Sequence, residues 1–245
     1  MLHERMQSAL FEIYELMDDA GARQEQRGGH DQGARANVTS GRHLDKVAEV
    51  IADDLKAGGF KSTEVRWGGS SAKLPGWFRY SKDWDMLALD GRYLLAAIEL
   101  KSISSSFGKN YNNRAEEAIG SAVDAKYAID NGQIRYRESP PALGYVLIIR
   151  DCEESRRFGR TRDTSFPIDG DPWLSREFSG MSYLDRFHTM CHRLLEGQIY
   201  QAVWLVYVDD ENSQIREPDP DLSYDAFIGT LLKHFFTVEA MSEDE

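Results

Sequence analysis

The sequence predicts an α/β fold with a central mixed β-sheet flanked by α-helices. Apolar patterns with the period of helices and with that of strands alternate along the chain, without internal repeats or a clear linker. The chain has 245 residues, 41% of them hydrophobic, which is enough for a full core and excludes a disordered tail. We therefore expect residues 1–245 to form a single domain.

The N-terminal part is expected to hold two helices. Residues 1–20 have apolar side chains at helical spacing, whereas residues 21–40 are polar and Gly-rich and predict a mobile loop, so residues 1–40 read as a helix and a loop. A second helix with a clear apolar stripe follows Thr39 and Ser40, which are candidate caps, and Gly58-Gly59 ends it.

The rest of the chain continues the mixture. Strands are expected at residues 61–67, 84–89, 93–101, 143–149 and 201–208. Helices are expected from about Asn113, with Glu116 placed as in a capping box, at residues 183–195 and after Ser223. Asp90-Gly91, between two of the strands, is a strong hairpin signal.

The net charge of -12, from 29 basic and 41 acidic residues, at first argues against a polyanionic partner such as DNA. The excess acid is local, however, because residues 207–245 hold eleven acidic residues against Arg216 and Lys233. Residues 209–245 therefore read as an acidic loop and a C-terminal helix. We expect basic loops to face any nucleic acid and this acidic segment to face away from it.

Composition and motifs exclude several classes of protein. The two cysteines, Cys152 and Cys191, exclude a disulfide framework and a Cys-rich zinc ribbon. A signal peptide and a long apolar run are both missing from the sequence, so we expect a cytoplasmic protein without a membrane partner. His188 and His192 lie four residues apart, but with no third and fourth ligand evident we interpret them as ordinary helix packing.

Two acidic residues and a lysine form the most informative pattern. Asp85 lies at the start of one expected strand, and Glu99 and Lys101 lie near the end of its partner. Since side chains alternate along a strand, Glu99 and Lys101 share a face, and a lysine among apolar residues needs a charged partner. Two converging carboxylates would bind a hard divalent cation, with Mg²⁺ the usual candidate.

This hypothesis makes a demand on strand register. A strict two-residue turn at Asp90-Gly91 would place Asp85 opposite Ala96 and would leave Glu99 on the other face. A longer turn or a β-bulge would shift the pairing and bring Asp85 and Glu99 to one face. The hypothesis therefore requires such a shift.

A polar segment follows Lys101. Residues 102–113 are rich in serine and asparagine and lead into the expected helix. Backbone N–H groups at a helix start, together with Asn amides, Lys109 and Arg114, would suit a phosphate chain. An ordinary Asn-capped helix explains the same residues equally well.

Several stretches resemble the PD-(D/E)xK nucleases, and among them the type II restriction endonucleases similar to XhoI. The most specific is the block Asn112-Asn113-Arg114-Ala115-Glu116-Glu117. The resemblance covers roughly residues 41–208, and Trp84 stands where the superfamily name has proline. The other matching stretches are Gly41-Arg42-x-x-Asp45, Leu74-Pro75-Gly76, Trp84-Asp85, Glu99-Leu100-Lys101-Ser102, Phe107-Gly108-x-Asn110, Asp151-Cys152-Glu153 and Ser182-Tyr183-Leu184.

The resemblance implies a restriction-endonuclease-like core and Mg²⁺-dependent hydrolysis of double-stranded DNA that leaves 5′-phosphate ends. By analogy Asp85 and Glu99 would ligate the metal together with the Leu100 carbonyl, and Lys101 would orient or help deprotonate the attacking water. Some relatives recruit one more acid from the preceding helix, for which Glu49 is the first candidate and Asp45 the second.

It also implies a homodimer that reads a palindrome, with CTCGAG as the default site, and a cognate DNA methyltransferase in the same system. Candidate DNA-binding residues are Lys109, Asn110, Asn112, Asn113, Arg114, Arg156 and Arg157, with Arg160 and Arg162 in the same arginine-rich stretch. Three alternatives stay open at this stage: a repair or recombination nuclease with the same core, a non-catalytic DNA- or protein-binding module, and an acidic immunity-type protein.

Overall fold

The computed structural model describes residues 2–26, 42–58, 63–159, 178 and 180–243. Its centre is a six-stranded mixed sheet in the order β1-β4-β5-β6-β7-β8. Strands β5, β6 and β7 are parallel, and the other neighbouring pairs are antiparallel. The six strands are β1 (Thr63–Trp67), β4 (Met86–Asp90), β5 (Tyr93–Ile103), β6 (Ala142–Arg150), β7 (Ala202–Asp209) and β8 (Gln214–Arg216). This confirms the expected fold class.

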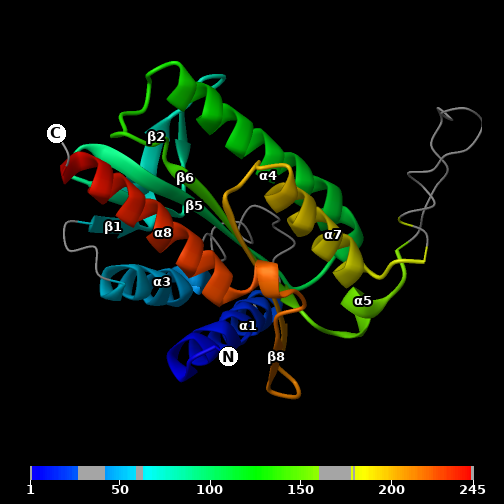
Figure 1. The fold of residues 1–245 in the computed structure, drawn as a ribbon. Coiled ribbons are helices and arrows are strands. Elements are labelled where there is room, and N and C mark those ends of the chain that lie inside the picture. The colour runs from blue at the N-terminus through cyan, green and yellow to red at the C-terminus, as the bar shows by residue number, and fades with distance from the viewer. Residues whose placement is uncertain (1, 27–41, 59–62, 160–177, 179, 244–245) are drawn as a thin grey trace, which may run out of the picture.

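Helices cover both faces of the sheet (Figure 1). The helices α1 (Glu4–Gln26), α3 (Asp45–Ala57) and α8 (Tyr224–Glu243) bury their apolar residues against one face, together with Ile98 and Leu100 of β5. On the other face lie α4 (Phe107–Asp130) and α7 (Tyr183–Glu196), packed over Ala97 and Ile103. Odd-numbered residues in the second half of β5 therefore point toward α4 and α7.

Several expected boundaries need correction. α1 continues to Gln26, into the segment expected to be a loop, and α4 begins at Phe107 rather than near Asn113. The acidic segment after β7 is not only loop, because it contains β8 and a short 3-10 helix, η3 (Pro220–Leu222). Thr39, Ser40, Gly59, Arg160 and Arg162 lie outside the described residues.

The β4–β5 hairpin has the register shift that the sequence hypothesis requires. Asp90 pairs with Tyr93, so the turn is Gly91-Arg92, one residue later than expected, and Gly91 takes a φ of 58°. Between Ala88 and Leu89 the register shifts, so that beyond the bulge Met86 lies opposite Ile98. The next residue on each strand is Asp85 and Glu99, which therefore belong to one face.

A second, two-stranded sheet is the fold's main addition to what the sequence predicted. Strands β2 (Lys73–Pro75) and β3 (Ser81–Asp83) pair in antiparallel register, with Leu74 opposite Lys82. They are preceded by η2 (Gly69–Ala72), while η1 (Arg42–Leu44) leads into α3 and α5 (Glu153–Arg156) follows β6. Runs of three or four residues are too short to show a period.

Asp124 of α4 fixes the turn between β2 and β3. Its Oδ1 accepts hydrogen bonds from the backbone N–H groups of Trp77 (3.0 Å) and Phe78 (2.7 Å), and its Oδ2 pairs with Arg79 Nε at 3.0 Å. The Asp124 side chain is only 4% exposed, so these partners provide the hydrogen bonds that water cannot give its carboxylate. The hairpin is thereby attached to α4, which covers the face of the sheet that includes Ala97 and Ile103.

We expect Asp124→Ala to lower the free energy of unfolding by about 1–2 kcal/mol, because it leaves two part-buried N–H groups and one guanidinium without their acceptor. Urea denaturation followed by circular dichroism measures the change. Asp83→Ala is the matched control, since that aspartate in the same hairpin is 62% exposed and should cost about 0.5 kcal/mol or less. Equal losses in the two variants would contradict this role for Asp124.

Candidate active site

Asp85 and Glu99 face one another across β4 and β5. The backbone N–H of Leu100 donates to Asp85 Oδ2 at 2.7 Å, which holds the Asp85 carboxylate against the middle of β5. Glu99 is 6% exposed and points into the layer beneath α4. The bulge thus produces the pair of converging carboxylates that the sequence pattern indicated.

Lys101 connects the two carboxylates. Its Nζ lies 2.5 Å from Glu99 Oε1 and 3.1 Å from Asp85 Oδ2, and it also donates to the Leu100 carbonyl oxygen at 3.1 Å. Lys101 therefore contacts every group that the resemblance implies as a metal ligand on these two strands. All three expected catalytic residues are brought together.

Burial and charge act against each other on these groups. Burial raises the pKa of Asp85, the nearby Glu99 carboxylate adds to this, and the Lys101 ammonium opposes it without cancelling it. For Lys101, burial favours the neutral amine, but the Glu99 and Asp85 carboxylates outweigh it and leave the pKa of the lysine raised. Lys101 is therefore an ammonium in this state and acts as a hydrogen-bond donor.

Sequence reasoning missed a fourth residue at the site, Lys82. Its Nζ donates to Glu99 Oε2 at 2.7 Å and to the backbone carbonyl of Asp83 at 3.2 Å. The Lys82 side chain is 12% exposed and its ammonium lies 4.9 Å from the centre of the Trp84 ring. Lys82 comes from β3, a strand the sequence did not predict, so no spacing rule connected it to Glu99.

The donor set of the site suits a hard divalent cation. Two carboxylates and the Leu100 carbonyl are oxygen ligands of the kind that Mg²⁺ prefers. In this structure the ammonium groups of Lys82 and Lys101 neutralise the two carboxylates. In the described part of the chain, no three or more His, Cys, Asp and Glu side chains are arranged to hold a metal ion. Any metal here would thus rest on two carboxylates, backbone and solvent.

Glu49, expected as a further metal ligand, lies elsewhere. It belongs to α3, which packs on the opposite face of the sheet, and its Oε1 accepts from Arg5 Nη2 at 3.2 Å on the surface. Asp45 begins the same helix and is exposed. The expectation of an extra acid from the preceding helix is therefore corrected.

The expected DNA-binding residues after Lys101 lie in the first turns of α4, directly beyond β5, which carries Glu99 and Lys101. Lys109, Asn112 and Asn113 are exposed, so their side chains are available to a ligand. Asn110 donates to the Ser105 carbonyl at 2.8 Å, and Arg114 Nη1 lies 2.5 Å from Glu117 Oε2.

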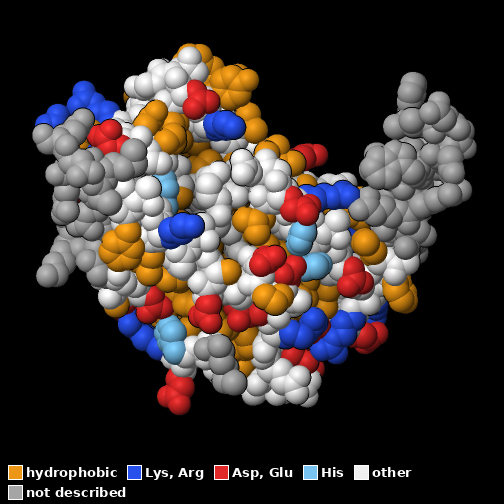
Figure 2. Space-filling model, viewed as in Figure 1, with side chains coloured by type: hydrophobic (Ala, Val, Ile, Leu, Met, Phe, Trp, Pro, Cys, Tyr) orange, Lys and Arg blue, Asp and Glu red, His pale blue; other side chains and the backbone are white. Residues whose placement is uncertain are grey.

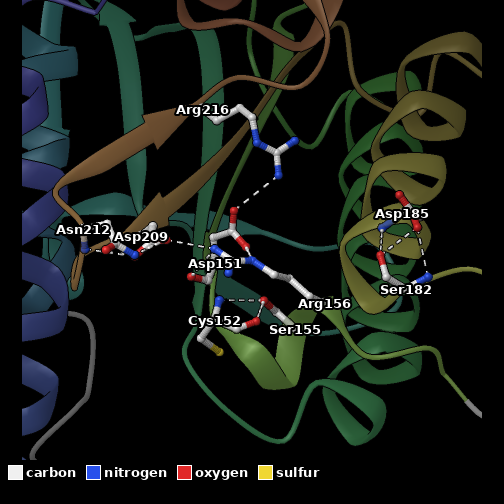
Figure 3. Close-up of polar contacts among 9 residues, drawn as sticks. All are labelled: Asp151, Cys152, Ser155, Arg156, Ser182, Asp185, Asp209, Asn212 and Arg216. Carbon is white, nitrogen blue, oxygen red and sulfur yellow. Dashed lines mark hydrogen bonds and ion pairs between the residues drawn. The ribbon is translucent and has the colours of Figure 1, made fainter.

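Arg156 and Arg157 lie just beyond the end of β6, which runs parallel to β5, so they share an edge of the sheet with the start of α4. Arg156 contacts Asp151 Oδ1 at 2.7 Å and Asp209 Oδ2 at 2.8 Å, and Arg216 lies 3.3 Å from Asp151 (Figure 3). Arg157 pairs with Glu153 at 2.7 Å.

These ion pairs correct the expected division of the surface. Asp209 begins the acidic segment, yet it binds Arg156 directly instead of facing away from the arginines. On the face shown in Figure 2, basic side chains stand beside acidic ones. The arginines are thus already neutralised in the free protein and would have to exchange partners to contact a phosphate.

His188 and His192 lie near one carboxylate, that of Asp219, at 3.1 and 3.9 Å from its Oδ2. His192 also pairs with Glu196 on the same helix. This arrangement connects α7 to the segment before α8, in keeping with the interpretation of the two histidines as ordinary helix packing.

Comparison with known proteins identifies a family and several relatives. The family model described as restriction endonuclease XhoI matches residues 23–217, a span that includes all three catalytic candidates. The chain belongs to this family. Within it, the type II restriction enzyme BstVI of Geobacillus stearothermophilus is 32% identical over 225 residues, 88% of this chain and 97% of that enzyme.

Two further relatives align over shorter spans. The type II restriction enzyme XhoI of Xanthomonas vasicola is 41% identical over 165 residues, which is 66% of this chain and 64% of that enzyme. The type II restriction enzyme AbrI of Azospirillum brasilense is 37% identical over 150 residues, 60% of this chain and 65% of that enzyme. No solved structure matches the chain significantly. No helix in the described part of the chain has the length and apolarity needed to cross a membrane.

A double-mutant cycle tests the contact between Lys82 and Glu99. We expect the effects of Lys82→Met and Glu99→Gln on the free energy of unfolding to be non-additive, with a coupling of about 1–3 kcal/mol, because both side chains are buried and bonded to each other. Urea denaturation of the two single variants and the double variant gives this coupling. The same cycle with Lys73→Met in place of Lys82→Met should show additivity within about 0.5 kcal/mol, because Lys73 pairs with Asp83 instead. Additivity in both cycles would contradict the contact.

Proposed function

We propose that the chain is a type II restriction endonuclease that hydrolyses double-stranded DNA at a short palindrome in the presence of Mg²⁺, leaving 5′-phosphate ends. The observation that carries this proposal is the convergence of Asp85, Glu99 and Lys101, created by the bulge in the β4–β5 hairpin. Membership of the restriction endonuclease family supports it.

Restriction endonucleases of this type generally use divalent metal ions. In this chain Asp85, Glu99 and the Leu100 carbonyl would hold the ion, and the oxygen chemistry of this set favours Mg²⁺. A bound ion lowers the pKa of a coordinated water and stabilises negative charge on the phosphate. Asp85 is kept in place for this role by the Leu100 N–H.

Lys101 would position the attacking water. Its ammonium touches both carboxylates, so it stands beside any group they bind. As an ammonium it donates hydrogen bonds to the water or to the scissile phosphate, where fixed positive charge stabilises the developing negative charge. It could accept a proton only after losing one, which its raised pKa opposes.

The DNA would follow the edge of the sheet where β5 and β6 end. Lys109, Asn112 and Asn113 present exposed donors there, next to Asn110 and Arg114. Arg156 and Arg157 at the same edge would bind phosphates after release from their carboxylates. Asn on adenine and Arg on guanine are the pairings that would read bases.

A palindromic site calls for two copies of the chain related by a two-fold axis, so we propose a homodimer. The Xanthomonas relative carries the name XhoI, and for this reason CTCGAG is the first sequence to test. A host that makes such an enzyme needs a cognate DNA methyltransferase to protect the same sites.

Digestion of a plasmid that contains one CTCGAG site, followed by sequencing of the ends, tests this function. The wild type with Mg²⁺ should cut at one discrete sequence, and Asp85→Asn and Lys101→Ala should each lower the rate by about a thousandfold or more, because they remove groups that act on the reacting phosphate. Lys73→Met is a control for a surface lysine outside the site and should cut at the wild-type rate.

Cutting at branched or damaged DNA without a preferred sequence would favour a repair nuclease of the same fold. Binding of DNA without any Mg²⁺-dependent cleavage would favour a non-catalytic module. Unchanged cleavage by both Asp85→Asn and Lys101→Ala would remove the proposed active site.

A further inference from the structure

Lys82 is the residue at the site that the motif does not explain. It reaches Glu99 from β3, outside the six-stranded sheet, and its ammonium bonds Glu99 Oε2 at 2.7 Å. The β2–β3 hairpin that carries it is attached to α4 through Asp124, so the position of its backbone is fixed. Lys82 is therefore built into the site.

Both oxygens of Glu99 are engaged by lysines in this structure. Oε1 lies 2.5 Å from Lys101 and Oε2 lies 2.7 Å from Lys82. A cation that uses Glu99 as a ligand must therefore replace at least one ammonium. The ammonium with fewer contacts is the one that a cation would displace.

The two lysines are held differently. Lys101 bonds both carboxylates and the Leu100 carbonyl, three acceptors in all. Lys82 bonds one carboxylate and the carbonyl of Asp83 and lies 4.9 Å from the centre of the Trp84 ring, so it has one carboxylate partner where Lys101 has two. Lys82 is thus the more easily displaced of the two.

Charge makes this displacement necessary. Asp85 and Glu99 carry two negative charges, and Lys82 and Lys101 carry two positive charges, so the set is already neutral. A divalent cation that enters this partly buried, neutral set meets two ammonium groups, and they repel it more strongly than they would in bulk water. A DNA phosphate offers Lys82 an alternative partner of the same charge as Glu99.

We propose that Lys82 is a positioning residue that occupies Glu99 in the metal-free protein and transfers to a DNA phosphate when substrate binds, which makes metal loading depend on DNA. This inference rests on the proposed function, because it takes Asp85 and Glu99 as the metal site. It explains why a buried carboxylate of the site has a second lysine beside the one in the motif.

Mn²⁺ binding to the full chain without DNA tests the first half of the proposal. Free Mn²⁺ is measured by electron paramagnetic resonance during titration of the wild type, Lys82→Met, Lys73→Met and Asp85→Asn. Methionine keeps an unbranched apolar stem beside Trp84 while removing the charge, and urea denaturation establishes that each variant is folded. Lys73→Met removes one charge from the same hairpin without touching Glu99.

We expect Lys82→Met to bind Mn²⁺ about tenfold more tightly than the wild type, and Lys73→Met to bind like the wild type. An affinity of Lys82→Met that is unchanged or weaker would overturn the inference, since a merely structural lysine would lower stability without improving metal binding. The proposed function fails separately: in that case Asp85→Asn would bind Mn²⁺ as well as the wild type does.

DNA binding tests the second half. Fluorescence anisotropy with a short duplex containing CTCGAG, without metal and over a range of salt concentrations, should show weaker binding by Lys82→Met and a salt slope lower by about one ion. Lys73→Met should keep the wild-type slope. Equal slopes for Lys82→Met and the wild type would contradict the transfer of Lys82 to a phosphate.

Discussion

Two carboxylates that face each other inside a sheet are stable only if positive charge lies between them, and the site is organised around that need. Glu99 is almost fully buried, and Asp85 stands opposite it on the neighbouring strand. The bulge brings them to one face; without it, Glu99 would point into the apolar layer under α3 and α8. Lys101 and Lys82 neutralise the pair, and in the proposed function a divalent cation would take over part of this role.

The rest of the fold positions the residues around the Asp85–Glu99 pair, at the edge of the sheet where β5 and β6 end. β5 carries Glu99 and Lys101 and continues into α4, so the exposed polar residues at the start of α4 lie at the edge where the strand ends. β6 runs parallel to β5 and brings Arg156 to that edge, where Asp151 and Asp209 already neutralise it. The net charge of -12 is therefore a poor guide to DNA binding: in the free protein these arginines are paired, and binding would exchange carboxylates for phosphates.

The sequence predicted the elements that have a long apolar run, such as β5, β6 and β7, or a regular helical period, such as α7 and α8. It also predicted that Asp85, Glu99 and Lys101 come together and stated the register shift that this requires, although it could not show that Leu95 would supply the extra residue of the bulge. It missed β2, β3 and β8 because three residues carry no period, and with β3 it missed Lys82. It placed the start of α4 six residues late because Asn113 and Glu116 imitate a helix cap. The partners of Arg156 and the place of Glu49 depend on tertiary contacts that no local pattern encodes.

The central claim is that Asp85 and Glu99 form one divalent-cation site next to Lys101. A crystal structure of the protein with a short CTCGAG duplex and Mn²⁺, with anomalous diffraction data collected at the manganese edge, tests it most directly. We predict an anomalous peak within bonding distance of Asp85, Glu99 and the Leu100 carbonyl, with Lys101 beside it. A manganese ion bound to other residues, or a Glu99 side chain on the α3 face of the sheet, would contradict the account.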